Sequence, residues 1–251
     1  MCKNRIASRI IILSFIICGS FAISKGQSGK IKLTEFHKRY YGKWPKTMTY
    51  LEQLIGNRFK ETWDVTNYYA ASYPDKFRVD LGNIDDGNAE IRIGGDVHTF
   101  TGFKKKNKFI DLKIDFMNYI IGHMYFEELQ TVADRFADAG IDLTKSFTRT
   151  WKGRKVIALG AASADTTYNQ IWYDAIDMYP VRRLEMVGRN RDDYHYTIEK
   201  SEGFWFPKEF KHYRNGRLIY DRRYTQVKRN VALDPEIFNL DNFGAVNSFN
   251  P

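Results

Sequence analysis

The stretch from Asn169 to Leu240 constrains the fold most, because it reads as an antiparallel β-meander. It is a series of short runs rich in aromatic and β-branched residues, each bounded by Gly, Pro, Asn or Asp. The Asn215-Gly216 pair is a strong hairpin signal, since both central residues of a type I′ turn need a positive φ. Within one run the side chains alternate, with Tyr194 and Tyr196 on one face and His195 on the other. The whole stretch is therefore predicted as strand, in a sheet with one covered face.

The rest of the chain fits a single domain over residues 25–240. A short helix is predicted from Thr34, its N-cap, through Tyr41. Antiparallel strands are expected from Thr47 onward, separated by Gly-rich and Asp-rich turns. The small and polar residues of 241–251 predict a flexible tail.

One long helical signal interrupts the strands. Apolar side chains at three-to-four spacing predict a helical insertion near residues 116–139. Gly122 disfavours helix at its own position, so a break into two pieces is left open there. Strands resume at Ser146 and continue into the meander.

Residues 1–24 have the features of a secretory signal peptide. Three basic residues within the first nine positions precede an apolar run from Ile10 to Cys18. Ser20-Phe21-Ala22 then supplies a small-x-Ala cleavage site. The alternative is a membrane anchor, but the uncharged run from Ile10 to Ser24 is short for a span of about 20 residues. Export with cleavage is therefore predicted.

Both cysteines, Cys2 and Cys18, lie inside this segment, so the cleaved chain would contain none and could not rely on disulfides. Lipidation of Cys18 is the competing interpretation. Gly19 suits a bacterial lipidation site, but the bulky Ile17 stands where a small residue is expected. Soluble export is therefore favoured over a lipoprotein tethered through Cys18.

The charge pattern does not indicate nucleic-acid binding. The formal charge of the chain is +9 and falls to +6 when the basic residues of the signal segment are removed. The remaining cations are scattered among acidic residues, and only Lys104-Lys105-Lys106 forms a run. This run fits a solvated hairpin turn that keeps a sheet edge soluble.

The sequence offers little for catalysis or for a metal ion. It contains no G-x-S-x-G or H-E-x-x-H motif, and no cysteine remains after cleavage. His123 and Glu127 are four residues apart on a predicted helix, but a surface polar pair explains them better than half of a metal site. Asp85-Asp86-Gly87-Asn88 lacks the rest of a calcium loop. We therefore expect no enzyme activity, no cofactor and no metal.

Several motifs follow one another in a definite order. The first are Y-P-D-K-F-R-V-D, a G-G-D turn and V-H-T-F. Later come I-W-Y-D-A-I-D-M-Y-P-V-R, G-F-W-F-P and N-V-A-L-D-P-E-I-F-N-L. In this order they resemble the periplasmic lipoprotein carrier and acceptor proteins, and the larger group of outer-membrane lipoprotein-sorting-like proteins. The resemblance covers nearly all of residues 34–240.

The resemblance implies an α+β, mostly β fold. In that family a curved antiparallel sheet forms an incomplete barrel, or cup, whose hollow is covered by a helical lid and receives the acyl chains of a lipoprotein. It also implies a protein of the Gram-negative periplasm. One position departs from the family pattern, because the carriers commonly hold an arginine before the proline of the early strand, where this chain has Tyr73 and has its arginine further along at Arg78. No site residue is therefore carried over from the family.

We expect an exported, non-enzymatic binding or carrier protein that holds a lipid acyl chain, a lipoprotein or another apolar ligand. We expect it to be a monomer that does not bind nucleic acid and that can meet a membrane surface. The candidate ligand-binding residues, chosen by alternation and helical spacing, are Trp63, Phe77, Val79, Ile91, Ile93, Leu112, Phe116, Tyr119, Ile120 and Met124. The alternative is a structural or interaction protein of the cell envelope, with the same fold but a filled hollow and no ligand.

Overall fold

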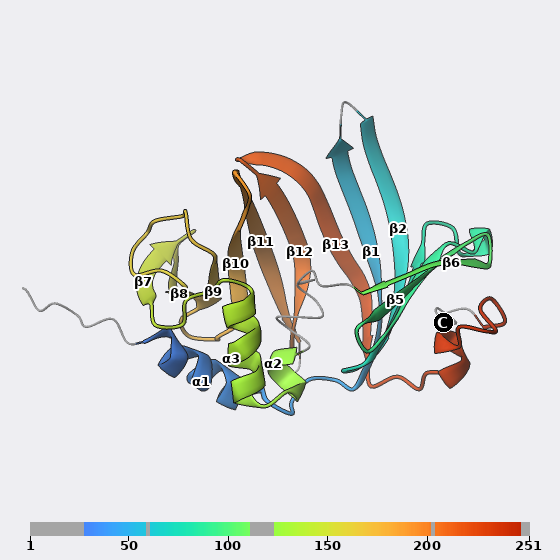
Figure 1. Cartoon of the computed structure of the whole chain (residues 1–251), viewed down its shortest axis with the longest axis horizontal. Helices are drawn as coiled ribbons and strands as arrows, with labels where there is room; N and C mark the ends of the chain where they lie inside the picture. The colour runs from blue at the N-terminus through green and yellow to red at the C-terminus, as the bar shows by residue number, and fades with distance from the viewer. Residues whose placement is uncertain (1–27, 59–60, 111–122, 202–203, 247–251) are drawn as a thin grey trace, which may run out of the picture.

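The computed structural model describes residues 28–58, 61–110, 123–201 and 204–246 (Figure 1). Within these ranges, thirteen strands form one sheet in the order β6-β5-β4-β3-β2-β1-β13-β12-β11-β10-β9-β8-β7. Every neighbouring pair is antiparallel. β6 and β7 stand at the two ends of this order, so over the described ranges the sheet is not closed into a barrel. The expected mostly β, antiparallel fold is confirmed.

The strands follow the chain in two groups. The first group is β1 (Thr47–Arg58), β2 (Glu61–Ser72), β3 (Lys76–Leu81), β4 (Ala89–Ile93), β5 (Asp96–Thr101) and β6 (Lys104–Ile110). The second group is β7 (Ser146–Trp151), β8 (Arg154–Leu159), β9 (Gln170–Asp174), β10 (Pro180–Val187), β11 (Asn190–Ser201), β12 (Phe204–Arg214) and β13 (Arg217–Arg229).

The predicted meander is confirmed from β9 to β13, where each strand pairs with the next. Its β12–β13 turn has φ of 50° at Asn215 and 81° at Gly216, the positive values that a type I′ hairpin needs. The prediction is wrong for the closing run, because the chain leaves the sheet after β13. There Pro235 begins the 3-10 helix η3 (Pro235–Phe238), and a side-chain oxygen of Asp234 accepts a hydrogen bond from the Glu236 N–H at 2.9 Å.

The two groups of strands meet where β1 pairs with β13 (Figure 1). Leu54 stands opposite Arg222 in this pairing, and a β-bulge between Thr49 and Leu51 shifts the register. Except for this junction, strands that are neighbours in the sheet are also consecutive in the chain. The β1–β13 pairing therefore joins all strands into one continuous sheet.

In the part of the chain that the structure describes, three α-helices accompany the sheet: α1 (Gly29–Tyr40), α2 (His123–Phe126) and α3 (Leu129–Asp138). The predicted start of the first helix is wrong, because Thr34 lies inside α1 and its Oγ1 donates to the Lys30 carbonyl at 2.8 Å. Residues 111–122 lie outside the described residues, and with them the expected break at Gly122. The described part of the insertion is interrupted further on, between α2 and α3.

The sheet has two faces of different character. We call the face that carries Tyr50, Tyr69 and Phe77 the inner face, because the apolar side chains of α1, α2 and α3 belong to the same buried cluster. Figure 1 shows these helices grouped in front of the β9–β12 part of the sheet. The opposite, outer face carries a second buried cluster around Ala70 and Ile91, to which η3 contributes.

The C-terminal segment packs on the outer face, over the part of the sheet formed by β3, β4 and β5. Arg78, only 2% exposed, donates from Nη1 to the carbonyls of Ile237 at 3.0 Å and Val246 at 2.9 Å. The Phe243 ring stacks on Phe100 with their centroids 4.1 Å apart. The sequence predicted a flexible tail from residue 241, but apolar side chains hold this segment on the sheet as far as Val246; residues 247–251 lie outside the described residues.

Candidate functional site

The inner face carries a buried patch of aromatic and aliphatic side chains. Cross-strand pairing places Tyr50 on β1 against Tyr69 on β2, with their rings stacked at 4.7 Å. Tyr69 also contacts Phe77 on β3, at a centroid distance of 5.4 Å. We call the side chains Met48, Tyr50, Tyr69, Phe77, Val79, Phe206 and Tyr224 the apolar patch. Alternation along the strands explains why they share one face.

The helices add their own apolar side chains to the buried cluster that contains this patch. Leu33 and Phe36 of α1, Met124 and Tyr125 of α2, and Val132 and Phe136 of α3 are all buried in the same cluster. The Sδ atom of Met124 lies 3.8 Å from the hydroxyl of Tyr173 on β9. On α3, Val132 and Phe136 are four residues apart, which places them on one side of the helix.

Tyr73 contacts α2 at the position where the resembling carriers hold an arginine. Its ring stacks on Phe126 with a centroid distance of 5.7 Å and an interplanar angle of 15°. Arg78, the arginine further along the motif, points to the outer face and binds the C-terminal segment. This corner of the sheet therefore meets the helices through an aromatic contact.

The structure brings together some of the predicted ligand-binding residues but not all of them. Phe77, Val79 and Met124 lie in the inner-face cluster. Trp63 stands opposite Gly56 on the same face, and a Cβ added at Gly56 would lie 2.1 Å from the Trp63 indole, so the indole covers this glycine. Leu112, Phe116, Tyr119 and Ile120 lie outside the described residues.

Ile91 and Ile93 do not join this group, so their predicted placement with Phe77 and Val79 is wrong. Ile91 stands opposite Arg78 in the β3–β4 pairing and shares the outer face with it. Both isoleucines pack in the outer cluster with η3. Their partners are therefore C-terminal residues and not the helices.

Beyond the apolar patch, the inner face becomes polar. Glu52 on β1 is 1% exposed, and its Oε2 accepts hydrogen bonds from Asn67 Nδ2 at 2.9 Å and from the Tyr69 hydroxyl at 2.8 Å. Its Oε1 lies 3.2 Å from Nη1 of Arg222 on β13. Burial raises the pKa of Tyr69 well above its ordinary value, so this hydroxyl remains a donor to the carboxylate at neutral pH.

A second polar group lies further along the inner face. Arg214 binds the carboxylate of Asp192 with two hydrogen bonds of 2.7 Å, and Nε2 of His212 lies 3.1 Å from the same carboxylate. Burial alone would raise the pKa of Asp192, but the hydrogen bonds from Arg214 and His212 lower it. The imidazole of His212 stacks on Tyr194 at 4.5 Å, and burial lowers the pKa of His212. The inner face therefore has an apolar part around Tyr50, Tyr69 and Phe77, and a charged, aromatic part around Asp192 and His212.

A pocket of about 320 Å³ opens where the C-terminal end of α1 meets α2 and the adjoining ends of β11 and β12. We call it the aromatic pocket; its lining residues are Arg39, Tyr40, Lys43, Trp44, Tyr125, Asp177, Lys200 and Trp205. The Gly42 N–H donates to the Tyr125 carbonyl at 2.8 Å and fixes α1 to α2 at this place. Prediction from sequence missed this site, although the aromatic run at G-F-W-F-P was a signal for it.

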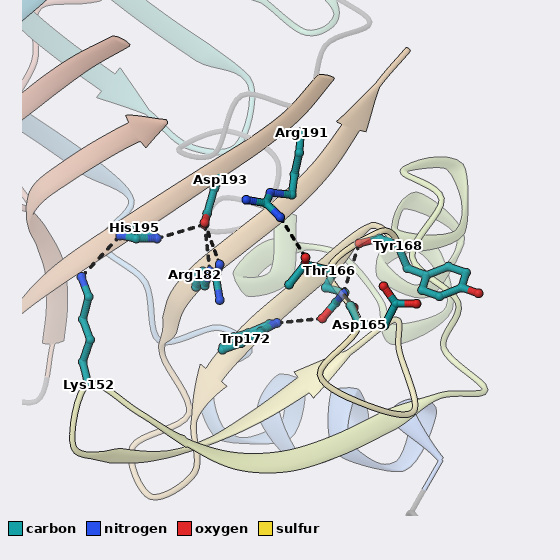
Figure 2. Close-up of polar contacts among 10 residues, drawn as sticks. Lys152, Asp165, Thr166, Tyr168, Trp172, Arg182, Arg191, Asp193 and His195 are labelled. Carbon is teal, nitrogen blue, oxygen red and sulfur yellow. Dashed lines mark hydrogen bonds and ion pairs between the residues drawn. The ribbon is translucent and has the colours of Figure 1, made fainter. Parts of the chain in front are cut away.

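The outer face of β10 and β11 carries a hydrogen-bonded network, shown in Figure 2. Arg182 binds Asp193 through two hydrogen bonds, of 2.8 and 2.6 Å, and its guanidinium lies 4.4 Å from the centroid of the Trp172 ring. Nε2 of His195 lies 3.0 Å from Asp193, and Nζ of Lys152 lies 3.4 Å from Nδ1 of His195. Burial lowers the pKa of Lys152. The contact between Lys152 and His195 links the β7–β8 turn to β11.

Over residues 28–58, 61–110, 123–201 and 204–246, no group of three or more His, Cys, Asp or Glu side chains is arranged to hold a metal ion. No helix found there has both the length and the apolar character to cross a membrane.

Solved structures share this fold at low sequence identity. A DUF1329 family protein from Desulfovibrio piger superposes with a TM-score of 0.60 at 10% identity, over 86% of this chain and 97% of that one. A domain described as an outer membrane lipoprotein-sorting protein from Vibrio parahaemolyticus gives 0.55 at 10% identity, over 84% and 96%. A LolA superfamily protein from Nitrosomonas europaea gives 0.53 at 10% identity, over 86% and 99%.

By sequence, neither a protein-family model nor a curated protein matches this chain. The three superpositions each cover more than four fifths of it. The chain therefore has the fold of the LolA-like lipoprotein-sorting proteins.

Proposed function

We propose that the protein is an exported, non-enzymatic carrier that holds an acyl chain or another apolar ligand against the apolar patch, with the helices acting as a lid. The observation that carries this proposal is the position of Met124. It is 0% exposed, belongs to α2 and lies in the same cluster as Phe77 and Val79. Methionine is flexible enough to repack when an apolar ligand displaces it.

The unclosed sheet supports the same proposal. An open antiparallel sheet can expose an apolar face when its covering helices move, and an acyl chain can then replace their side chains at little cost in buried area. The contact between Tyr73 and Phe126 is apolar and stacked, so its separation leaves no buried charge without a partner.

The proposed partner is a lipid acyl chain or a lipoprotein, and the proposed place is the periplasm. The signal-like segment at residues 1–24 and the lipoprotein-sorting fold of the neighbours support export. In this proposal the protein works as a monomer and meets the membrane surface when it loads or releases its ligand. Tethering through a lipidated Cys18 is the less favoured alternative.

A structural or interaction protein of the envelope is the second candidate. It is favoured by the completeness of the packing, since Leu33, Phe36 and Tyr125 are all 0% exposed in the inner-face cluster. In that reading the helices are permanent parts of the core and no ligand enters.

Binding of a fluorescent fatty acid analogue, measured together with thermal stability, separates the two candidates. The parent protein should bind the analogue. Met124→Asp should weaken binding, because a carboxylate that contacts an acyl chain loses its water without gaining a partner. Met124→Leu, which conserves volume, is the matched control and should bind like the parent. If the parent does not bind the analogue and Met124→Asp only lowers stability, α2 is a permanent part of the core and the carrier proposal fails.

A further inference from the structure

The aromatic pocket combines a buried apolar floor with a charged rim. Trp44, Tyr125 and Trp205 form the floor and are buried. The Trp44 and Tyr125 rings stack at 4.4 Å, and Trp205 meets Trp44 edge-on at 5.4 Å. Such a floor offers rigid aromatic surface to an apolar group.

The rim is positively charged. Arg39, Lys43 and Lys200 are exposed at the pocket, whereas Asp177 is the one carboxylate among its lining residues. Lys200 forms an ion pair with Asp177, and Nη2 of Arg39 lies 3.9 Å from the same carboxylate. Lys43 forms no ion pair within the described residues, so the rim has an excess of positive charge.

The rim is also held in place before any ligand arrives. Oδ1 of Asp174 accepts hydrogen bonds from the N–H groups of Ile176 and Asp177, at 2.9 and 2.8 Å. Nη1 of Arg39 donates to the Ile176 carbonyl at 2.5 Å, and the Tyr40 hydroxyl donates to the Asp177 carbonyl. Burial raises the pKa of Tyr40 to about 12, so its hydroxyl keeps the proton at neutral pH. A preformed site loses less conformational entropy on binding.

The floor of the pocket carries a polar group, the hydroxyl of Tyr125. The Tyr125 hydroxyl is buried and makes no hydrogen bond with the described residues. Burial also raises the pKa of Tyr125, so the group is a hydroxyl donor and not a phenolate. Because an unsatisfied buried hydroxyl is costly, a ligand oxygen that reached it would be stabilised.

We propose that the aromatic pocket binds an amphiphile through its anionic headgroup, a phosphate or a carboxylate attached to an apolar group. The oxygens of the headgroup pair with Lys43, Lys200 and Arg39, and the apolar part lies on Trp44 and Trp205. The site goes beyond the proposed carrier function, because a charged rim contributes nothing to an acyl chain alone. A volume of about 320 Å³ suits a headgroup with its first apolar atoms.

Isothermal titration calorimetry with dodecyl phosphate, kept below its micelle concentration, tests this site. Inorganic phosphate and dodecyltrimethylammonium are the comparison ligands, since the first lacks the apolar part and the second reverses the charge. Dodecyl phosphate should bind at least tenfold more tightly than either, and rising salt should weaken it. Equal binding of all three ligands, or of the two phosphates, would overturn the proposal.

Variants that remove positive charge from the rim test whether the ligand binds in the aromatic pocket. The double variant Lys43→Gln/Lys200→Gln should lose at least tenfold in affinity for dodecyl phosphate while keeping the parent melting temperature within a few degrees. The matched control is Lys104→Gln/Lys106→Gln, which removes two exposed charges from β6, far from the pocket in the sheet order, and should bind like the parent. If both double variants lose the same affinity, the ligand responds only to the net charge and the pocket is not its site.

Discussion

Nη1 of Arg222 lies 3.2 Å from Oε1 of Glu52, and this ion pair joins β13 to β1 where the two halves of the sheet meet. The carboxylate is 1% exposed, while the arginine side chain is 28% exposed. Asn67 and Tyr69 donate to the other carboxylate oxygen. Glu52 is therefore the centre of a buried polar group that holds strands from distant parts of the chain.

Glu52→Ala should lower the free energy of unfolding by about 2–4 kcal/mol, measured by urea denaturation. The variant removes the counter-charge of Arg222 and the acceptor for Asn67 and Tyr69. Partial exposure of Arg222 lets water solvate it, which keeps the expected loss below that of a fully buried pair.

Asp64→Ala is the matched control for this measurement. Asp64 is an exposed carboxylate on the neighbouring strand β2, and its hydrogen bonds come from the side chain of Gln53. Its removal should change the free energy of unfolding by no more than about 0.5 kcal/mol. Equal losses in the two variants would show that the Glu52 group does not join the halves of the sheet.

The Asp193 carboxylate on the outer face should make stability depend on pH. Burial alone would raise its pKa, but hydrogen bonds from Arg182 and His195 lower it from 3.8 to about 2. A lowered folded-state pKa stabilises the protein at pH values above the unfolded-state pKa, and this stabilisation is lost as the pH falls from about 4 toward 2. At neutral pH it amounts to about 2 kcal/mol.

Asp193→Asn tests this pH dependence. The difference in free energy of unfolding between the parent and Asp193→Asn should be largest from pH 5 to 7 and should shrink as the pH falls below 4. Urea denaturation at several pH values measures it. A difference that stays constant down to pH 3 would mean that the ionisation of Asp193 is not the cause.

The meander could be predicted from its turn residues, whereas the order of the strands in the whole sheet could not. Asn215-Gly216 specifies that β12 pairs with β13, because few other residue pairs accept two positive φ values. No comparable local signal joins β1 to β13, because that pairing depends on the burial of side chains on both strands. The order of motifs, compared with a known family, supplied what local reasoning could not.

The face of the sheet on which a strand residue lies could also be predicted only in part. Alternation correctly places Ile91 and Ile93 on one face of β4. It does not say whether that face is the one that carries Phe77, since this depends on the register across the loop between β3 and β4. The register pairs Ile91 with Arg78, and the outer face is the result.

The aromatic pocket could not be predicted from the sequence, for a different reason. Its lining comes from α1, the α1–β1 connection, α2, the β9–β10 connection and the ends of β11 and β12, which are separated widely in the chain. By themselves, Arg39-Tyr40 and Lys43-Trp44 show only a common pattern, an aromatic residue beside a basic one. Only folding brings Lys43 and Lys200 to the same rim.

Processing of the chain is predicted from its first residues. Because the apolar run ends before Ser20-Phe21-Ala22, we expect a mature N-terminus near Ile23 or Lys25. Intact-mass analysis of protein recovered from the periplasm measures it. A diacylated Cys18 at the N-terminus, or an uncleaved Met1, would contradict soluble export.

The C-terminal segment should contribute to stability through Phe243. Its ring stacks on Phe100 at 4.1 Å and receives the Arg78 guanidinium at 4.7 Å from its centroid, so it shields a buried charge from water. Phe243→Ala should lower the free energy of unfolding by about 1–3 kcal/mol, less than for a fully buried phenylalanine because the ring is half-buried. Val187→Ala, which trims an apolar side chain that is 45% exposed, is the control and should change it by no more than about 0.5 kcal/mol. If Phe243→Ala costs no more than Val187→Ala in urea denaturation, the segment rests on the sheet without stabilising it, and Arg78 must be held by Asp80 and the backbone carbonyls alone.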